Sequence, residues 1–258
     1  MARLPEDYQI VIPARFSSTR YPGKPLVLIE GVPMVVHVAL NCLEIADRNQ
    51  VIVATDDNRI SKVVESYNIR CVETSKNHLT GTDRVGEVSK NSPRKFFINV
   101  QGDEPLVSGE DILKVVKLFE SHGKRIIATG YCDYEIRFNE DSKTVPKIVT
   151  TEDNQLLYVS RLNIPFDYDS YKKNLSTGIV ARRQVCIYVF AAESLKKYSE
   201  RPKKTYLESL EDIEILRFLE LGEEVRVVKV NDSRAVDTPE DLEAIKKLIK
   251  SKRENANN

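Results

Sequence analysis

Short apolar runs alternate along the first half of the chain with segments whose apolar residues recur at helical spacing. The run "YQIVIP" at residues 8–13 predicts a buried strand, and "PMVVHVALNCLEIA" after it predicts an amphipathic helix. The same order of strand and helix returns within residues 50–67, 69–90 and 95–122. This alternation predicts an α/β fold with a mostly parallel central sheet flanked by helices on both faces.

The pattern becomes richer in strands from about residue 126. Residues 126–190 contain several β-rich runs, and "TTEDNQLL" at 150–157 has the polar centre that is typical of a hairpin turn. A parallel first half joined to an antiparallel insertion predicts a mixed sheet. We therefore expect an inserted, strand-rich subregion at 126–190.

The C-terminal part of the chain returns to helical spacing. Two helices are predicted at 206–222 and 238–252, with the strand "EVRVVKV" between them. The last residues, 251–258, are polar and are expected to form a frayed tail. No linker or internal repeat interrupts the pattern, so residues 1–250 are predicted to form a single domain.

Composition and charge exclude several classes of protein. Of the 258 residues, 41% are hydrophobic and 30% are charged, as in globular proteins. The 39 basic and 39 acidic residues cancel, which disfavours a general nucleic-acid or membrane-surface binder, and basic clusters such as "RPKKTY" are expected on solvated faces. The first residues resemble neither a signal peptide nor a membrane anchor, so a cytoplasmic protein is expected.

The cysteine and histidine residues are scattered rather than paired. No CxxC or zinc-like spacing occurs, so reduced thiols are predicted and a transition-metal site is disfavoured. The four cysteines are Cys42, Cys71, Cys132 and Cys186.

The loop after the first predicted strand, "IPARFSSTRYPGKPL" at 12–26, concentrates positive charge. It carries Arg15, Arg20 and Lys24, and Gly23 permits a close approach of the backbone. The glycine spacings of the Walker and Rossmann loops are both absent. Three cations at the end of a buried strand favour a polyphosphate ligand over an exposed basic loop that binds nothing.

Two aspartates are candidate metal ligands. Asp103 in "NVQGDEP" follows a predicted strand, where a carboxylate can hold Mg²⁺ together with phosphate oxygens, or can simply cap a turn. Asp237 in "AVDTPEDLE" precedes a predicted helix, and spacing alone favours a helix cap by Asp237 or Thr238. Asp237 becomes a metal ligand only if it reaches the same cation as Asp103.

The segment "LTGTDRVGEV" at 79–88 predicts another loop-to-helix junction, with Thr82 at the cap and Arg84 in the first turn. The helix dipole disfavours an arginine at this position. A ligand contact and a salt bridge to a neighbouring carboxylate both account for Arg84.

Taken in order along the chain, these motifs resemble those of the CMP-Kdo synthetases, the 3-deoxy-manno-octulosonate cytidylyltransferases. The matching motifs are "IPARFSSTRYPGKPL", "VATDD", "TGTDRV", "NVQGDEPL", "YVSRLNIPF" and "VDTPEDLE", which extend from about residue 8 to residue 245. The resemblance implies transfer of CMP from CTP to the anomeric hydroxyl of an eight-carbon sugar acid, with Mg²⁺ and release of pyrophosphate. It also implies a nucleotide-diphospho-sugar transferase fold, a homodimer and a place in lipopolysaccharide biosynthesis.

The resemblance further assigns roles to individual residues. Those implied for CTP binding are Ala14, Arg15, Lys24, Thr82 and Arg84, with Arg15 and Lys24 also acting in catalysis. Those implied for the metal, and counted as catalytic with it, are Asp103 and Asp237. Those implied for the sugar acid are Gln101, Arg161, Gln184, Tyr188 and Glu214.

Two departures from the family pattern fall on the sugar side. The family usually has "HLGIY" where this chain has "QVCIY", so Gln184 and Cys186 replace histidine and glycine. Ile215 follows Glu214 where the family usually has glutamine. These changes allow two hypotheses: an altered acidic sugar such as 8-amino-Kdo, or neutral drift with Kdo retained.

Other functions are open as alternatives. A cytidylyltransferase for nonulosonic, sialic-type acids shares a similar "IPAR" opening but fits the later motifs less well. A catalytically silent nucleotide-binding regulatory protein would be expected to lack the metal carboxylates, whereas Asp103 and Asp237 are both present. A sugar-1-phosphate nucleotidyltransferase is a weaker third alternative, which would require a phosphorylated sugar.

Overall fold

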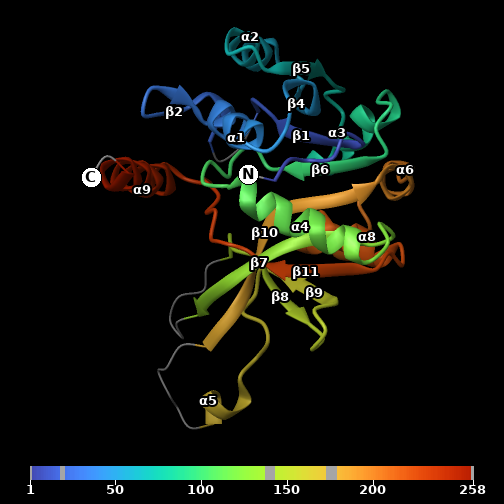
Figure 1. Ribbon diagram of the computed structural model, residues 1–258. Coiled ribbons are helices and arrows are strands. Elements are labelled where there is room, and N and C mark those ends of the chain that lie inside the picture. The colour runs from blue at the N-terminus through green and yellow to red at the C-terminus, as the bar shows by residue number, and fades with distance from the viewer. Residues whose placement is uncertain (1, 18–20, 137–142, 173–178, 257–258) are drawn as a thin grey trace.

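The computed structural model describes residues 2–17, 21–136, 143–172 and 179–256. Arg20 lies outside the described residues. The central sheet has the strand order β11-β7-β10-β6-β1-β4-β5, with β8 and β9 attached beside β10 (Figure 1). The predicted mixed α/β fold is confirmed.

The first half of the chain supplies the parallel part of the sheet. Its strands β1 (Tyr8–Ala14), β4 (Val51–Thr55), β5 (Arg70–Glu73) and β6 (Phe96–Val100) all run in the same direction. Because neighbouring residues of a strand point to opposite faces, Ile10 and Ile12 of β1 join one hydrophobic cluster and Val11 joins another. This is the two-sided burial that the continuous apolar runs predict.

Helices cover both faces of this sheet. The cluster of Ile10 includes residues of α1 (Met34–Leu43), α2 (Asn58–Ser66) and α4 (Gly109–Ser121). The cluster of Val11 includes residues of α3 (Gly81–Lys90), α6 (Ala192–Ser199) and α8 (Ile215–Glu220). Ser108 caps α4 by accepting a hydrogen bond from the Asp111 N–H, as the sequence predicts.

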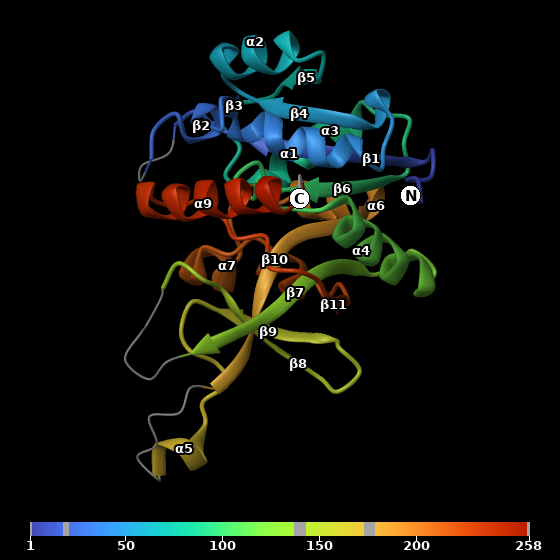
Figure 2. The ribbon, with the colours of Figure 1, turned by 60° about the vertical axis from the view of Figure 1, so that its left-hand side comes forward.

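The strands of the strand-rich region are part of the central sheet and do not form a separate insertion beside it. β10 (Ile179–Ala191) is antiparallel both to β6 and to β7 (Ile127–Ile136), and β11 (Val225–Lys229) runs parallel to β7. The predicted hairpin is present as β8 (Lys147–Thr150) and β9 (Leu156–Ser160). Figure 2 shows this hairpin and α5 (Tyr168–Lys172) projecting away from the helical layers.

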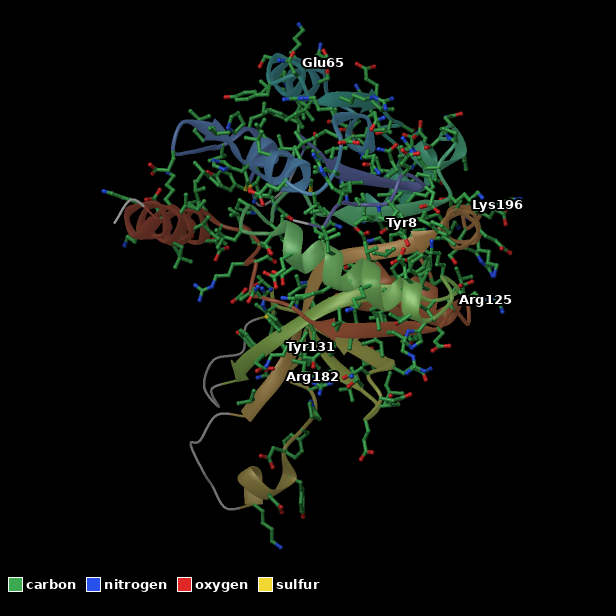
Figure 3. All side chains as sticks on the ribbon, in the orientation of Figure 1. Tyr8, Glu65, Arg125, Tyr131, Arg182 and Lys196 are labelled. Atoms are coloured by element: carbon green, nitrogen blue, oxygen red, sulfur yellow. The ribbon has the colours of Figure 1, made fainter. Side chains whose placement is uncertain are left out.

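The side chains of this projecting region continue the sheet packing. The Arg182 guanidinium of β10 lies 4.6 Å from the centre of the Tyr131 ring on β7 (Figure 3). A cation over an aromatic face is an attractive arrangement at a partly exposed site. The far halves of β7 and β10 are thus joined by side chains as well as by the backbone ladder.

The structure corrects two predicted boundaries near the C-terminus. The helix expected at 206–222 is divided into α7 (Tyr206–Glu211) and α8, because Asp212 between them adopts a left-handed backbone conformation with φ of 54°. Helix α9 (Pro239–Ala256) continues into the segment that was expected to fray. Several short elements were not predicted: η1 (Lys24–Leu26), β2 (Leu28–Ile29), β3 (Val32–Pro33), η2 (Arg48–Gln50), α5 and α6.

Two further expectations concern cysteines and membranes. The four cysteines are free thiols, as predicted, and burial raises the pKa of Cys71 to about 12 and that of Cys132 to about 11. Within the described ranges, no helix combines the length and the apolar character needed to cross a membrane.

Candidate active site

A cleft with a volume of about 830 Å³ lies at the carboxyl ends of β1 and β6, where open parallel sheets bind their ligands. Its lining comes from segments that are distant in the sequence. Among the lining residues are Arg15, Gln101, Asp103, Glu104, Arg161, Arg183, Gln184, Cys186, Tyr188, Lys204, Glu208, Asp212, Glu214, Asp232, Arg234, Asp237 and Asp241.

Lys24 lies between the two aspartates that the sequence singles out. Its Nζ is 2.7 Å from Asp103 Oδ2 and 3.5 Å from Asp237 Oδ1, and it also donates to the Val236 carbonyl at 2.8 Å. The two carboxylates therefore lie close enough together to contact the same ammonium group. Their role as metal ligands stays a prediction. We call these three residues the Lys24 triad.

Local backbone structure places each member of the Lys24 triad. Gly23, with φ of 73°, turns the chain into η1 and so directs Lys24 inward. The Val236 N–H donates to the Asp103 carbonyl at 2.9 Å, which ties the two acidic loops together. The cap of α9 is formed by Thr238, which accepts a hydrogen bond from the Asp241 N–H at 3.2 Å, so Asp237 is not needed for capping.

The chemistry of the Lys24 triad fits a hard divalent cation. In the described part of the chain, no group of three or more His, Cys, Asp or Glu residues forms a metal centre. A pair of carboxylates is nevertheless the protein contribution that Mg²⁺ usually takes, because phosphate oxygens and waters complete its shell. Asp103 and Asp237 would hold such an ion once the Lys24 ammonium moved toward a phosphate.

Glu214 binds the first turn of α3. Its carboxylate accepts hydrogen bonds at 2.9 Å from the N–H groups of Gly81 and Thr82, and another from the Thr82 hydroxyl. These are the N–H groups that a helix leaves unpaired at its start. Burial raises the pKa of Glu214, while the bonds from Thr82 and Gly81 act in the opposite direction.

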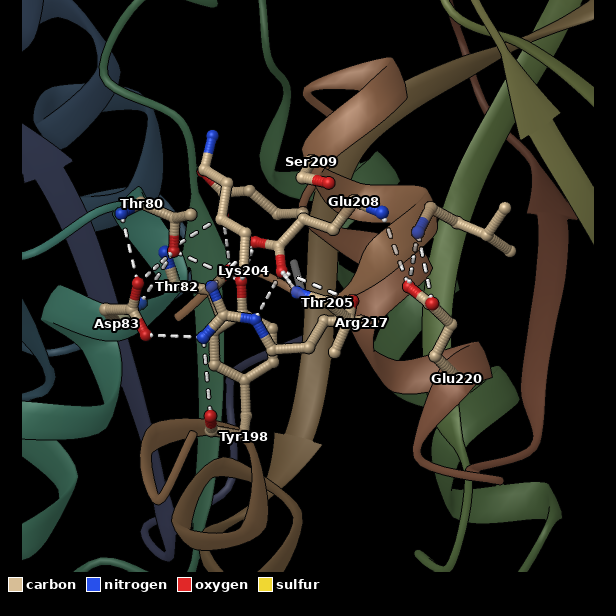
Figure 4. Close-up of polar contacts among 12 residues, drawn as sticks. Thr80, Thr82, Asp83, Tyr198, Lys204, Thr205, Glu208, Ser209, Arg217 and Glu220 are labelled. Carbon is tan, nitrogen blue, oxygen red and sulfur yellow. Dashed lines mark hydrogen bonds and ion pairs between the residues drawn. The ribbon is translucent and has the colours of Figure 1, made fainter. Parts of the chain in front are cut away.

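A second set of charges anchors the same turn (Figure 4). The fully buried Arg217 donates twice to Glu208, at 2.6 Å each, and once to Asp83 at 2.8 Å. Its guanidinium also lies 3.8 Å from the centre of the Tyr198 ring. We call Arg217, Glu208 and Asp83 the Arg217 triad.

The Arg217 triad corrects the predicted cap of α3. The N-cap is Thr80, which accepts from the Asp83 N–H, while Asp83 accepts in return from the Thr80 N–H at 3.0 Å. Thr82 is therefore inside the helix, where its hydroxyl contacts Glu214. The cap is two residues earlier than the sequence suggested, because Asp83 is held in place by Arg217 from α8.

Alternate residues of β10 form one wall of the cleft. Gln184, Cys186 and Tyr188 line it, while Val185 and Ile187 join the hydrophobic cluster on the other face of the sheet. The side chain of Gln184 is buried, and neither its Nε2 nor its Oε1 has a hydrogen-bond partner among the described residues.

Arg161 lies on the same side of the cleft as Gln184. Its guanidinium donates to four backbone carbonyls, at distances between 2.7 and 3.3 Å. These are the carbonyls of Lys143, Thr144, Glu211 and Asp212. Neutral carbonyls fix the orientation of the guanidinium but leave its positive charge available to an anionic ligand.

The cleft brings together most of the residues assigned by the sequence. Eight line it: Arg15, Gln101, Asp103, Arg161, Gln184, Tyr188, Glu214 and Asp237. Lys24 joins them through its two aspartates. Ala14 is buried at the end of β1, and Thr82 lies beneath Glu214. The roles assigned to these residues stay predictions.

Two residues lie elsewhere than expected. Arg84 is fully buried and pairs with Asp56 at 3.1 Å, so the salt-bridge interpretation is confirmed and the residue is absent from the cleft lining. Ile215 is buried in the cluster of α3, α6 and α8 and is also absent from the lining. Its replacement of the family's glutamine therefore affects core packing, which corrects its assignment to the sugar side.

Several cleft residues were missed by sequence reasoning. Lys204 was assigned to a solvated cluster, yet it lines the cleft and pairs with Asp212. Glu104, deeply buried beside Asp103, accepts from the Cys186 N–H at 3.2 Å and from the Ser233 hydroxyl, and burial raises its pKa. The only available signal for Glu104 was its place next to Asp103 at a strand end.

The fold and the two-carboxylate cleft define an α/β protein built for nucleotidyl transfer, and comparisons with known proteins narrow this class. A family model described as cytidylyltransferase matches residues 9–226. The 3-deoxy-manno-octulosonate cytidylyltransferase of Geobacter sulfurreducens is 38% identical over 249 residues, covering 93% of this chain and 98% of that protein. The chain therefore belongs to the cytidylyltransferase family, among the 3-deoxy-manno-octulosonate cytidylyltransferases.

Solved structures agree with this assignment. A structure of CMP:2-keto-3-deoxy-manno-octonic acid synthetase complexed with CTP superposes with a TM-score of 0.84 at 31% identity, covering 95% of this chain and 99% of that chain. A cytidylyltransferase from Leptospira borgpetersenii serovar Hardjo-bovis has a TM-score of 0.59 at 16% identity, covering 93% of this chain and 85% of that one, and shares the fold.

Proposed function

We propose that this protein transfers CMP from CTP to the anomeric hydroxyl of 3-deoxy-manno-octulosonate or a closely related sugar acid. The observation that carries the proposal is the Lys24 triad, in which Asp103 and Asp237 share one cation at the cleft of a chain with this family membership. In the reaction, the anomeric oxygen bonds to the α-phosphorus and the bond to the β-phosphate breaks. Pyrophosphate leaves, and the hydroxyl proton passes to solvent.

Asp103 and Asp237 are proposed to hold Mg²⁺. When bound, the ion would neutralise phosphate charge and polarise the α-phosphate. Lys24 would then leave its two aspartates and, with Arg15, offset the charge of the triphosphate and of the leaving pyrophosphate. Arg15 is exposed on the cleft lining, where such a contact costs little desolvation.

The acceptor is proposed to bind at the end of the cleft that contains Arg161 and Gln184. Within the described residues, the Arg161 guanidinium donates its hydrogen bonds to neutral carbonyls, so it can still pair with the carboxylate of a sugar acid. Gln101 and Glu214 are neighbours, since a Cβ placed on Gly81 would lie 3.4 Å from Gln101 Nε2 and 3.3 Å from Glu214 Oε1. In-line orientation of the two bound substrates, together with this charge neutralisation, accounts for the transfer without a covalent intermediate on the protein.

A pyrophosphate-release assay tests the proposal. The protein is incubated with CTP, Mg²⁺ and one acid at a time from a panel of 3-deoxy-manno-octulosonate, its 8-amino derivative and nonulosonic acids. We expect release with the first acid and none when CTP is replaced by ATP or Mg²⁺ by EDTA. Release only with nonulosonic acids would replace the proposed acceptor, and binding of CTP without release in any combination would favour the regulatory alternative.

We also propose a homodimer formed through the strand-rich region. Leu157, Leu162, Tyr168 and Val180 are between 54% and 65% exposed there. These residues belong to the region around β9, α5 and the start of β10 that projects from the helical layers (Figure 2). Exposed apolar side chains on such a region are typical of a protein interface. Light scattering should give twice the monomer mass, and Leu162→Glu with Val180→Glu should give the monomer mass. A monomer for the unaltered protein would overturn the proposal.

A further inference from the structure

The side-chain amide of Gln184 stands out among the buried polar groups. Among the buried amide side chains of the described residues, it alone leaves both its nitrogen and its oxygen without a partner. Other buried glutamines are paired: Gln50 Nε2 donates to the Pro5 carbonyl at 2.8 Å, and its Oε1 accepts from the Asp47 N–H at 3.1 Å. An unsatisfied buried amide is costly, so a group that pairs with it would bind with corresponding gain.

The positions of Tyr188, Cys186 and Gln184 along the wall of the cleft that β10 forms indicate which substrate would lie beside Gln184. Tyr188 is paired with Asn99 of β6, whose amide donates to the Thr82 hydroxyl in the first turn of α3. Two residues back, the Cys186 N–H donates to Glu104, the neighbour of the proposed metal ligand Asp103. The wall thus runs from the α3 end of the cleft toward the metal carboxylates.

Gln184 follows two residues further along the same wall. Its N–H donates to the Pro146 carbonyl at 3.0 Å, and the adjoining Thr144 carbonyl accepts from the Arg161 guanidinium at 3.3 Å. Gln184 therefore lies past the metal carboxylates, at the acceptor end that Arg161 marks.

The hydrogen-bonding capacity of the amide selects the chemical group. Nε2 only donates and Oε1 only accepts, so complete pairing of the amide needs an acceptor beside Nε2 and a donor beside Oε1. Hydroxyl groups can fill both places, whereas carboxylates fill only the first and ammonium groups only the second. We propose that Gln184 is a specificity-determining residue that pairs with hydroxyl groups of the acceptor's carbon chain. This inference rests on the proposed function of the cleft.

The decisive variant is Gln184→Leu, with Gln50→Leu as a matched control far from the cleft. At saturating CTP, Gln184→Leu should raise the KM of the sugar acid about tenfold to a hundredfold and leave the KM of CTP within about twofold. Gln50→Leu should change neither. If Gln184→Leu releases pyrophosphate with an unchanged KM for the sugar acid, this inference is overturned while the proposed function stands. No release with any acid from the unaltered enzyme would overturn the proposed function and this inference with it.

Acceptor analogues and thermal stability sharpen the test. Among analogues that each lack one hydroxyl, at least one should be a poorer substrate for the unaltered enzyme but no poorer for Gln184→Leu. If every such analogue lost as much activity with Gln184→Leu as with the unaltered enzyme, the hydroxyl assignment would be contradicted. Without ligands, Gln184→Leu should raise Tm by about 2–4 °C, while Gln50→Leu should lower it. A lowered Tm in both would mean that the Gln184 amide is already paired, and would overturn the inference.

Discussion

Two cations in this protein each lie between two carboxylates, and the two sets differ in burial and in bond geometry. In the Lys24 triad, a single ammonium reaches Asp103 at 2.7 Å and Asp237 at 3.5 Å, and both carboxylates are partly exposed to the cleft. In the Arg217 triad, a guanidinium makes three bonds of 2.6 to 2.8 Å, and Arg217 and Glu208 are fully buried.

The difference distinguishes a binding site from a scaffold. A bidentate arginine pair without access to water is rigid, and removal of one partner leaves a buried charge without its counter-ion. The Lys24 ammonium has one short and one long contact to a carboxylate and one to the Val236 carbonyl, all beside the cleft. Water and ligand can reach these partners there and take the place of the ammonium. The Arg217 triad therefore holds α3 in position, whereas the Lys24 triad, with the same pattern of charges, can receive a ligand.

The largest expected effect on this comparison comes from Arg217→Met. Loss of the guanidinium leaves the Glu208 carboxylate buried without its cation, so the free energy of unfolding should fall by about 3–5 kcal/mol. Urea denaturation measures this change. Adding Glu208→Gln should recover part of the loss, and an Arg217→Met protein as stable as the original would contradict the scaffold role.

Asp103→Asn should affect activity instead of stability. Removal of one carboxylate of the proposed metal site should lower kcat about a hundredfold or more, with Tm within a few degrees of the original. Pyrophosphate release at saturating CTP and sugar acid gives kcat. Asp57→Asn, on the surface beside Arg59, is the matched control and should retain full activity. Undiminished release by Asp103→Asn would remove the proposed metal role.

Lys24→Met should show most clearly that the Lys24 triad acts in binding whereas the Arg217 triad acts in stability. We expect the KM of CTP to rise about tenfold, because a triphosphate contact is lost, while the free energy of unfolding changes by less than about 1 kcal/mol. Mg²⁺ alone should raise Tm more in this variant than in the original protein, since the ammonium no longer competes for Asp103 and Asp237. An equal Mg²⁺ effect in both proteins would argue against a shared site.

The smallest effect is expected at an exposed ion pair, Asp57 with Arg59. The hydrogen bond from the Arg59 side chain lowers the pKa of Asp57 from 3.8 to about 2. Because the folded-state pKa is the lower one, this stabilisation is present above about pH 4 and is lost as the pH falls toward 2. Asp57→Asn keeps a good N-cap for α2, so Tm should decline less steeply between pH 4 and 2. An identical acid profile for both proteins would contradict this pKa assignment.

Much of the fold follows from local patterns in the sequence. Continuous apolar runs correctly predict β1, β4 and β6, because strands buried on both faces need apolar residues at every position. Helical spacing correctly predicts α1 and α4. Patterns of this kind are readable because each residue's burial depends mainly on its neighbours in the chain.

The sequence was less informative wherever a distant partner decides the outcome. The salt bridge of Arg84 depends on Asp56. The cap at Thr80 depends on Asp83, which is in turn bound by Arg217. The core position of Ile215 depends on how α8 packs. The break before α8 occurs at Asp212, which adopts a left-handed backbone conformation although it is not a glycine. None of these partners has a fixed spacing in the chain.

The sequence by itself determined the α/β alternation, the acidic residues at strand ends and the basic loop "IPARFSSTRYPGKPL". Only the tertiary structure decided that Asp103 and Asp237 share one cation, that Arg84 is buried in a salt bridge and that the Gln184 amide has no partner. The physical reason is that periodicity reports the burial of each segment. Charge pairing and hydrogen bonding are properties of side chains that meet only when distant segments pack together.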